Sequence, residues 1–369
     1  MKKLLSVLIA MIMIVGVLPV TAFSASKTVN IYGCRISASA KQVCFVVGDE
    51  NDFSTTFTAE NYAPGFKKYY YVPRGTVIDC KVIAEKLPEL QNLAIVYGGV
   101  KNLSALAELK DLVWLGLYQN DGAENLSFLK KLPRLKKFGY AMYNKCESIN
   151  PVSYLKDLTE LYIKVPSDAV SDTTPLKGLT KLKKLDINVK KDADLSFLKK
   201  LTKLESLKIR GVRSVKGLES VKGLKKLKSL DIDGLDSEQQ DLSFIGEMTW
   251  LESLYVSDSN RSFSKNISDL KSLKSLSILY TDIGVWYDRS FLKDLTGLEY
   301  LYLVDVQELD LTVISNLTKL KDLSVMLCEV GDLSGLKKCS ALENLAIFNC
   351  STDFDVKWIT GTDVKKLYF

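Results

Sequence analysis

The segment Leu112-Val113-Trp114-Leu115-Gly116-Leu117 contains the pattern that decides the fold. Its apolar residues follow the spacing Leu-x-x-Leu-x-Leu, so that the last two leucines stand two positions apart. Side chains at this spacing point to one face of a short β-strand. Because the same spacing recurs from Leu87 onward, we predict a series of short strands.

Thirteen copies of this pattern follow one another along the chain. Their mean period is about 22.8 residues, which lies in the range of leucine-rich repeats. One such unit cannot bury its apolar face alone, whereas stacked units share a continuous core. The copies are centred on Leu93, Leu115, Phe138, Leu161, Leu185, Leu207, Leu230, Leu254, Leu276, Leu301, Leu323, Leu345 and Leu367.

A second apolar series precedes the strands at a spacing of three residues. Leu198, Leu201 and Leu204, for example, lead into Leu207. This spacing suits a helical or 3₁₀ turn with one buried edge. We therefore predict an α/β solenoid of leucine-rich repeats, with a parallel β-sheet on the concave face and short helical or 3₁₀ turns on the convex face.

Several copies share a further motif before the turn, such as Asp194-Leu195-Ser196-Phe197-Leu198. With this motif, residues 83–369 resemble the short bacterial leucine-rich repeats of the internalin-like or SDS22-like class. The resemblance implies a right-handed superhelix that binds partners through its concave sheet. The sequence departs from that class after the strands. Only Asn120 clearly holds the usual asparagine there, while Cys328 and Cys350 hold that position in two late repeats.

The first residues of the chain have the order of a secretory signal peptide. Lys2 and Lys3 precede an apolar run from Leu4 to Val20, and small residues follow. We expect residues 1–24 to be removed on export, with a retained membrane anchor as the alternative. Since no second run of about 20 apolar residues follows, we expect no transmembrane segment after signal removal and a secreted or extracellular protein, either free or associated with the cell surface.

Residues 25–82 do not repeat. They contain strand-like segments such as Val43-Cys44-Phe45-Val46-Val47. A solenoid needs a terminal cap over the core of its first repeat, so we interpret this region as an N-terminal β-rich cap. An independent binding domain is the alternative. Residues 83–369 are then the solenoid, with about 13 repeats of 22–25 residues.

Composition excludes several classes of chemistry. The 369 residues include no His, which removes every Ser-His-Asp triad, Cys-His pair and His metal ligand. The seven Cys show no Cys-x-x-Cys spacing, so we expect neither a redox nor a zinc site, while one disulfide among Cys34, Cys44 and Cys80 stays open. No phosphate-binding loop fits. We predict a protein that is not an enzyme and that uses no cofactor and no metal.

Charge is spread unevenly along the chain. The whole chain has 50 Lys+Arg and 44 Asp+Glu, an excess too small to indicate a nucleic-acid binder. Residues 177–228, however, hold 17 basic and 5 acidic residues, whereas residues 231–369 hold 13 and 23. Much of the basic excess falls on convex turns. It is either a solvated face or a contact for an anionic surface such as a cell-wall polymer.

The concave face is the predicted binding site. Exposed aromatic side chains are common interface anchors, and a late loop insertion lies beside several of them. Packing of these rings along the sheet is the alternative. We expect a protein ligand, with a cell-wall or host glycan as the second hypothesis and a purely structural role as the third. The candidate partner-binding residues are Trp114, Tyr118, Lys208, Arg210, Tyr255, Trp286, Tyr300, Tyr302 and Phe348.

Overall fold

A computed structural model describes most of the chain. The described residues are 27–48, 63–142, 146–165, 170, 172–212, 214–234, 241–259, 267–281, 289–305, 309–350 and 364–368. The predicted signal peptide and the predicted binding residue Trp286 lie outside them. No helix among the described residues has the length and apolar character needed to cross a membrane.

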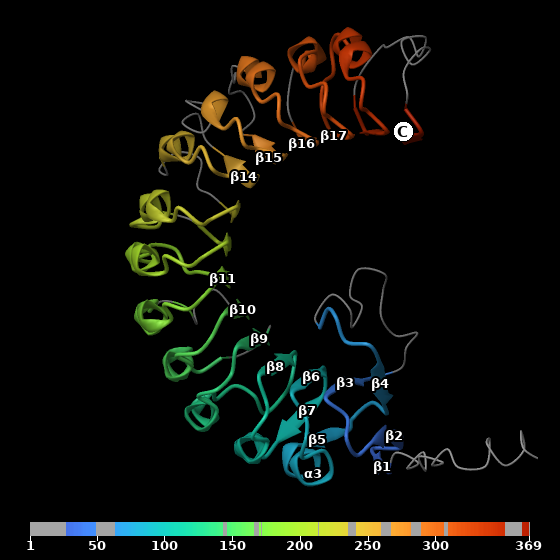
Figure 1. The fold of residues 1–369 in the computed structure, drawn as a ribbon, viewed down its shortest axis with the longest axis vertical. Helices are drawn as coiled ribbons and strands as arrows, with labels where there is room; N and C mark the ends of the chain where they lie inside the picture. Colours follow the sequence, from blue (N-terminus) through green and yellow to red (C-terminus); the bar gives the residue numbers. More distant parts are fainter. Residues whose placement is uncertain are drawn as a thin grey trace, which may run out of the picture.

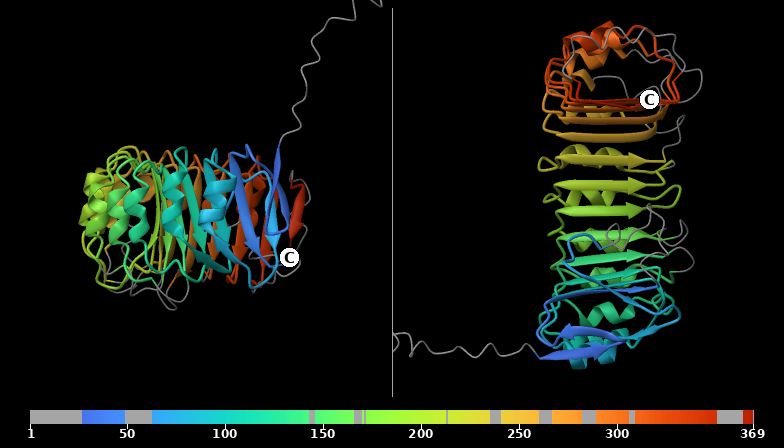
Figure 2. Two further views of the ribbon diagram at one scale, coloured as in Figure 1. Left: turned by 90° about the horizontal axis from the view of Figure 1, so that it is seen from below. Right: turned by 90° about the vertical axis from the view of Figure 1, so that its right-hand side faces the viewer.

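The described chain forms an arc of stacked coils. Strands line the inner side of the arc and short helices line its outer side, as Figures 1 and 2 show. Fifteen of the described strands form one sheet, in the order β19-β18-β17-β16-β15-β14-β13-β12-β11-β10-β9-β8-β6-β3-β4, and neighbours in it are parallel. The predicted leucine-rich-repeat solenoid is therefore confirmed.

The repeat strands coincide with the thirteen copies of the sequence pattern. They are β6 (Asn92–Val96), β8 (Trp114–Tyr118), β9 (Lys137–Ala141), β10 (Glu160–Lys164), β11 (Lys184–Asn188), β12 (Ser206–Arg210), β13 (Ser229–Asp233), β14 (Ser253–Ser259), β15 (Ser275–Thr281), β16 (Tyr300–Val304), β17 (Asp322–Met326), β18 (Asn344–Phe348) and β19 (Lys366–Tyr368).

The outer side of the repeats carries short 3₁₀ helices, and the α-helix α3 (Cys80–Lys86) lies beside the first of them. The 3₁₀ helices are η3 (Leu103–Glu108), η4 (Ser127–Lys131), η5 (Asn150–Tyr154), η7 (Thr174–Gly178), η8 (Ser196–Lys200), η9 (Leu218–Gly223), η10 (Ser243–Glu247), η11 (Ile267–Asp269), η12 (Arg289–Asp294), η13 (Leu311–Ile314) and η14 (Ser334–Lys338).

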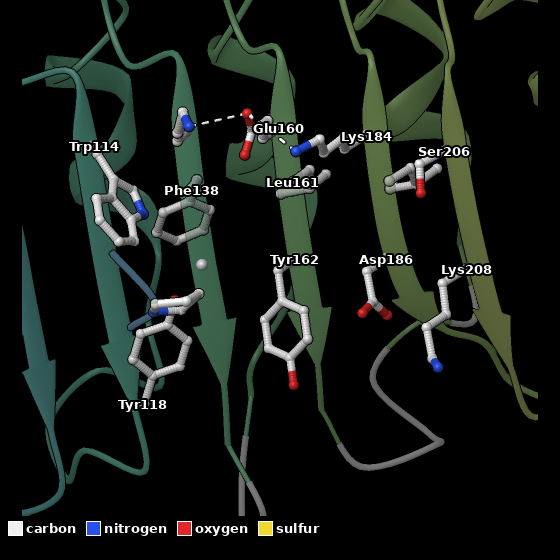
Figure 3. Close-up of a pocket in the computed structure, with 14 residues that line it drawn as sticks. Trp114, Tyr118, Phe138, Glu160, Leu161, Tyr162, Lys184, Asp186, Ser206 and Lys208 are labelled. Carbon is white, nitrogen blue, oxygen red and sulfur yellow. Dashed lines mark ion pairs between the residues drawn. The ribbon is translucent and has the colours of Figure 1, made fainter. Parts of the chain in front are cut away.

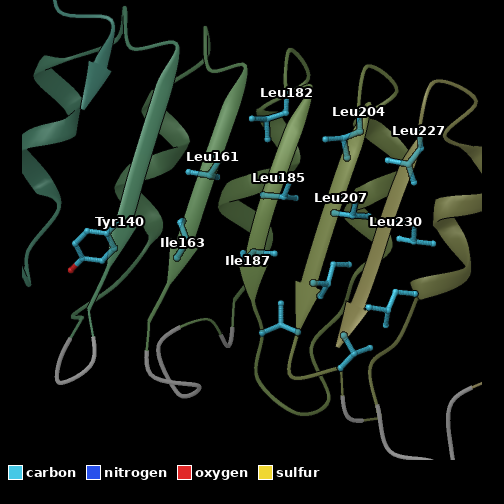
Figure 4. Close-up of a cluster of buried hydrophobic side chains, with 14 of the residues drawn as sticks. Tyr140, Leu161, Ile163, Leu182, Leu185, Ile187, Leu204, Leu207, Leu227 and Leu230 are labelled. Carbon is cyan, nitrogen blue, oxygen red and sulfur yellow. The ribbon is translucent and has the colours of Figure 1, made fainter. Parts of the chain in front are cut away.

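Each repeat strand has a core face and a concave face. The second and fourth residues point into the core, as Leu207 and Ile209 of β12 do, and both are fully buried. Figure 4 shows this layer of side chains in the middle repeats. The first, third and fifth residues face the concave side. Because the parallel strands pair in register, these residues form three rows that cross the sheet.

The Asp-Leu-Ser motif has a local structural reason. The Asp194 carboxylate accepts a hydrogen bond of 2.8 Å from the Ser196 backbone amide at the start of η8, and Asp241 and Asp332 do the same for Ser243 and Ser334. Such a side chain satisfies an amide that has no partner inside the turn. The same bond lowers the pKa of Asp194.

The N-terminal region continues the solenoid core. It contains β1 (Thr28–Ile31), β2 (Cys34–Ser37), β3 (Gln42–Val47), β4 (Tyr69–Val72), β5 (Val77–Asp79), α3 (Cys80–Lys86) and β7 (Gly99–Lys101). Strands β3 and β4 extend the main sheet beyond β6, and one buried cluster runs from Ile31 to Ile347. The predicted boundary between cap and repeats falls inside α3.

All seven cysteines are free, so the cap has no disulfide. Cys328 and Cys350 replace the asparagine that the repeat class uses after its strands. The Asn120 amide donates to the Tyr97 carbonyl at 2.7 Å, and the Cys328 thiol donates to the Met326 carbonyl at 3.1 Å. The Cys350 thiol lies 3.6 Å from the Val325 carbonyl. These thiols therefore donate weakly to carbonyls of strand residues, whereas the Asn120 amide donates to a carbonyl in the loop after β6, so the cysteines do not reproduce the asparagine contact.

A ladder of alternating charges runs along the edge where the strands begin. The residue immediately before each strand from β11 to β19 is alternately Lys and Glu. Five pairs of neighbouring members form ion pairs with N–O distances of 2.6–2.9 Å. Opposite charges side by side on adjacent strands favour this one stacking register over like-charge pairings. We call these residues the charge ladder: Lys183, Glu205, Lys228, Glu252, Lys274, Glu299, Lys321, Glu343 and Lys365.

Glu252 is the member of the charge ladder that forms ion pairs with both neighbouring lysines. Lys228 and Lys274 lie 2.8 and 2.9 Å from its carboxylate, and their hydrogen bonds lower its pKa from 4.5 to about 2. Since the folded pKa is lowered, the stabilisation is present above the ordinary pKa and is lost as the pH falls through about 2. We expect the Glu252 carboxyl signal in an NMR titration to have its midpoint near 2.

The control is the variant with both Lys228→Ala and Lys274→Ala. Its Glu252 midpoint should move up toward 4.5, because both hydrogen-bond donors are gone. A midpoint near 4.5 in the unsubstituted protein would contradict the ladder geometry.

Candidate functional site

All eight described candidate residues lie on the concave face, at strand positions one, three or five. Those in the early and middle repeats are Trp114 and Tyr118 on β8 and Lys208 and Arg210 on β12. Those in the late repeats are Tyr255 on β14, Tyr300 and Tyr302 on β16, and Phe348 on β18. They form three groups: an early aromatic region, a middle charged band and a late aromatic patch.

Tyr118 is buried, which corrects the expectation that it faces solvent. Only 3% of its surface is exposed. Its ring lies across Gly116 and Gly139, where a Cβ at either position would collide with it. Because glycine has no side chain, these two positions leave the space that the Tyr118 ring occupies.

A chain segment from outside the repeats covers the start of the concave face. Ala63 and Phe66, which precede β4, pack with Val96 and Tyr118 in a second buried cluster on this side of the sheet. The Phe66 ring packs against Trp114 with 4.5 Å between ring centroids. The segment rises on the inner side of the arc, as Figure 1 shows. It thus fixes one side of the Trp114 ring.

Beside this segment the concave face is hollowed. The hollow has a volume of about 450 Å³, and Figure 3 shows most of the side chains around it. Trp114 and Tyr118 form one side, Asp186 and Lys208 lie on the other, and Tyr162 projects between them. Its lining is Pro64, Trp114, Tyr118, Lys137, Phe138, Gly139, Glu160, Leu161, Tyr162, Lys184, Leu185, Asp186, Ser206 and Lys208.

The charged groups at the hollow are held in ion pairs. At the end where the strands begin, the Glu160 carboxylate lies 2.9 Å from Lys137 and 3.9 Å from Lys184. On the far side, Arg210 binds both oxygens of Asp186. Such paired groups keep one geometry and leave little net charge at the site.

Lys208 and Asp231 continue the middle charged band. They form a close ion pair, and Lys208 also lies 5.3 Å from the centroid of the Tyr255 ring. Burial raises the pKa of Asp231, while the hydrogen bond from Lys208 acts in the opposite direction. The candidates Lys208, Arg210 and Tyr255 are therefore parts of one connected layer on β11–β14 rather than separate exposed groups.

The late aromatic patch consists of Tyr300, Tyr302, Met326, Phe348 and Tyr368. Tyr300 and Tyr368 are 46% and 47% exposed. The Tyr302 hydroxyl donates to the Met326 sulfur at 3.0 Å, and the rings of Phe348 and Tyr368 are 6.4 Å apart. These contacts orient the patch while leaving part of it accessible to solvent.

Sequence reasoning missed several residues of the hollow. Tyr162 and Glu160 occupy concave positions that the repeat pattern identifies, and the two glycines at the third positions of β8 and β9 are a further signal in the sequence. The contact of Phe66 with Trp114 joins residues that no repeat relates. No local pattern could have indicated it.

Comparison with known proteins supports the fold. The sequence matches no protein-family model, and it has no match among curated proteins. Among solved structures, the chain is similar to an internalin, InlF of Listeria monocytogenes, with 20% identity, a TM-score of 0.56, and coverage of 77% of this chain and 82% of the internalin. It is also similar in structure to a leucine-rich-repeat protein of Leptospira interrogans, with 20% identity, a TM-score of 0.53, and coverage of 77% of this chain and 79% of that protein. The fold is internalin-like.

Proposed function

We propose that this protein is a non-catalytic scaffold that binds a protein partner through its concave face, with the late aromatic patch as the main contact. One observation carries the proposal. Of the six large apolar side chains that are exposed among the described residues, four lie at or beside β16–β19. Apolar exposure concentrated in one place is typical of an interaction surface, and tyrosine is common among interface anchors. Two of these four, Tyr300 and Tyr368, belong to the late aromatic patch; the others are Leu327, which follows β17, and Leu367, which holds the core position of the last strand.

The middle charged band supports a role in orientation. Its groups are paired with one another, so a partner gains little net energy from them, but fixed charges of both signs select a complementary surface. Its members are Asp186, Lys208, Arg210 and Asp231. The predicted signal peptide supports our further proposal that the protein acts outside the cell, free or at the cell surface.

We expect a variant with both Tyr300→Ala and Tyr302→Ala to lose at least about tenfold in affinity for the partner, because truncation of central aromatic anchors commonly costs this much. The partner is first captured from extracellular and surface fractions with the unsubstituted protein and identified by mass spectrometry. It is then purified and titrated against both forms.

Tyr154→Ala is the matched control. Tyr154 is 53% exposed but lies in η5 on the outer side of the arc, so its loss should leave affinity unchanged. Equal binding by the double variant and the unsubstituted protein would contradict the proposal. If binding were also lost at high salt and competed by cell-wall polysaccharide, that result would replace the proposal with the second hypothesis. In that hypothesis the aromatic and basic surfaces attach to a glycan or cell-wall polymer.

A further inference from the structure

We propose that the hollow between Trp114 and Lys208 is a separate binding site for a neutral sugar ring of an oligosaccharide. This site lies on β8–β12, away from the late aromatic patch, and the inference does not depend on the protein partner proposed above. The argument rests on the shape of the hollow, its aromatic side and the state of its charged groups.

The aromatic side offers a stacking surface. Trp114 and Tyr162 line the hollow and are both partly exposed. Because Phe66 packs against one side of Trp114, the indole is held in place before any ligand binds. The face of an aromatic ring is electronegative, and the C–H groups on one face of a pyranose ring are its complement. A ring positioned in advance loses little entropy on binding.

The rest of the lining offers hydrogen-bonding groups of both kinds. Asp186 and Glu160 present acceptors, and Lys208 and Lys184 present donors. A sugar hydroxyl both donates and accepts, so vicinal hydroxyls can use a neighbouring acceptor and donor together. Hydrogen bonds to charged groups are the stronger kind. Groups placed around a hollow of about 450 Å³ can therefore fix the orientation of a stacked ring.

The ion pairs favour a neutral ligand over a charged one. Glu160 already lies between Lys137 and Lys184, Asp186 is bound by Arg210, and Lys208 is bound by Asp231. An anionic or cationic ligand would gain little from groups whose charges are already compensated by a partner. A neutral hydroxyl can instead add to a pair, since a carboxylate has about four acceptor sites and an ammonium has three donors.

The test uses the unsubstituted protein and a panel of neutral hexasaccharides: β-1,4-linked glucose, β-1,4-linked N-acetylglucosamine and α-1,6-linked mannose. Hexagalacturonate is the anionic comparison, and a tyrosine-containing hexapeptide is the protein-like comparison. Binding is measured by isothermal titration calorimetry at low and high salt. We expect at least one neutral hexasaccharide to bind, with affinity that changes little with salt.

Variants then locate the site. Trp114→Ala and Tyr162→Ala should each weaken that binding by about tenfold, whereas Trp114→Phe, which keeps a ring, should weaken it much less. Tyr300→Ala, on the late aromatic patch, should leave it unchanged. Thermal melts monitored by circular dichroism confirm that each variant is folded.

Three results would overturn the inference: no neutral hexasaccharide binds, binding survives both alanine variants, or hexagalacturonate or the peptide binds in preference. Loss of sugar binding in Trp114→Ala with retention of the protein partner would support this site independently. Loss of the partner in the Tyr300/Tyr302 variant bears on the proposed function alone, so the two proposals fail separately.

Discussion

Replacing Gly335 with alanine is expected to destabilise the protein by about 1–3 kcal/mol or more, an unusual result for the smallest possible side-chain addition. A Cβ at Gly335 in η14 would overlap the Leu311 carbonyl oxygen of η13, and the next nearest atoms also belong to the backbone of that coil. Because no flexible side chain can move aside, two neighbouring coils must separate. Denaturant unfolding monitored by circular dichroism measures the change.

Gly223→Ala is the matched control. Gly223 ends the 3₁₀ helix η9, and a Cβ there would meet no atom within 4 Å. Alanine restricts the unfolded chain more than glycine does, so this variant should be neutral or stabilised by up to ~1 kcal/mol. Equal midpoints for the Gly335 and Gly223 variants would contradict the close approach of η13 and η14.

At Gly335 the repeat pattern and the structure predict different tolerance of a side chain. In the motif Asp332-Leu333-Ser334-Gly335-Leu336 the glycine corresponds to Phe197 of η8, which is buried without difficulty. The repeat pattern therefore predicts that Gly335 tolerates a side chain. The structure predicts the opposite, because the Leu311 carbonyl oxygen of the preceding coil occupies the space that a side chain at Gly335 would need.

Features that depend on local spacing could be predicted from the sequence. The Leu-x-Leu step determines which face of a strand enters the core, and the three-residue spacing before it determines the outer turns, so the solenoid and its concave rows follow directly. The concave placement of Trp114, Lys208 and Tyr300 follows from the same alternation. Export and the extent of the cap stay predictions.

Features that depend on contacts between distant segments could not be predicted. The burial of Tyr118 depends on two glycines on different strands and on the segment around Phe66, which does not belong to any repeat. Pro64 of that segment lines the hollow, and Phe66 packs against Trp114. The charge ladder is a different case, because the alternation of Lys and Glu at one repeat position is plain in the sequence once the strands are aligned.

The second large effect concerns the core of the middle repeats. Leu207→Ala is expected to cost about 2–5 kcal/mol, the usual range for a fully buried leucine, because Leu207 is 0% exposed and lies in register with Leu185 and Leu230 on the adjacent strands. In a solenoid each repeat contacts only its neighbours. The cavity left by Leu207→Ala therefore weakens the contact between the part of the solenoid before β12 and the part after it. Hydrogen exchange should therefore accelerate first in β11–β13.

Ser206→Ala is the control that makes this result specific. Ser206 is the neighbouring residue of the same strand, but it faces the concave side and is partly exposed. If the period-two alternation holds, its substitution should change stability by less than ~0.5 kcal/mol. Similar losses for both variants would mean that the core and concave faces had been assigned wrongly. A large loss for Leu207→Ala alone, with exchange confined to the middle strands, would instead show that each repeat is held by its two neighbours and not by the arc as a whole.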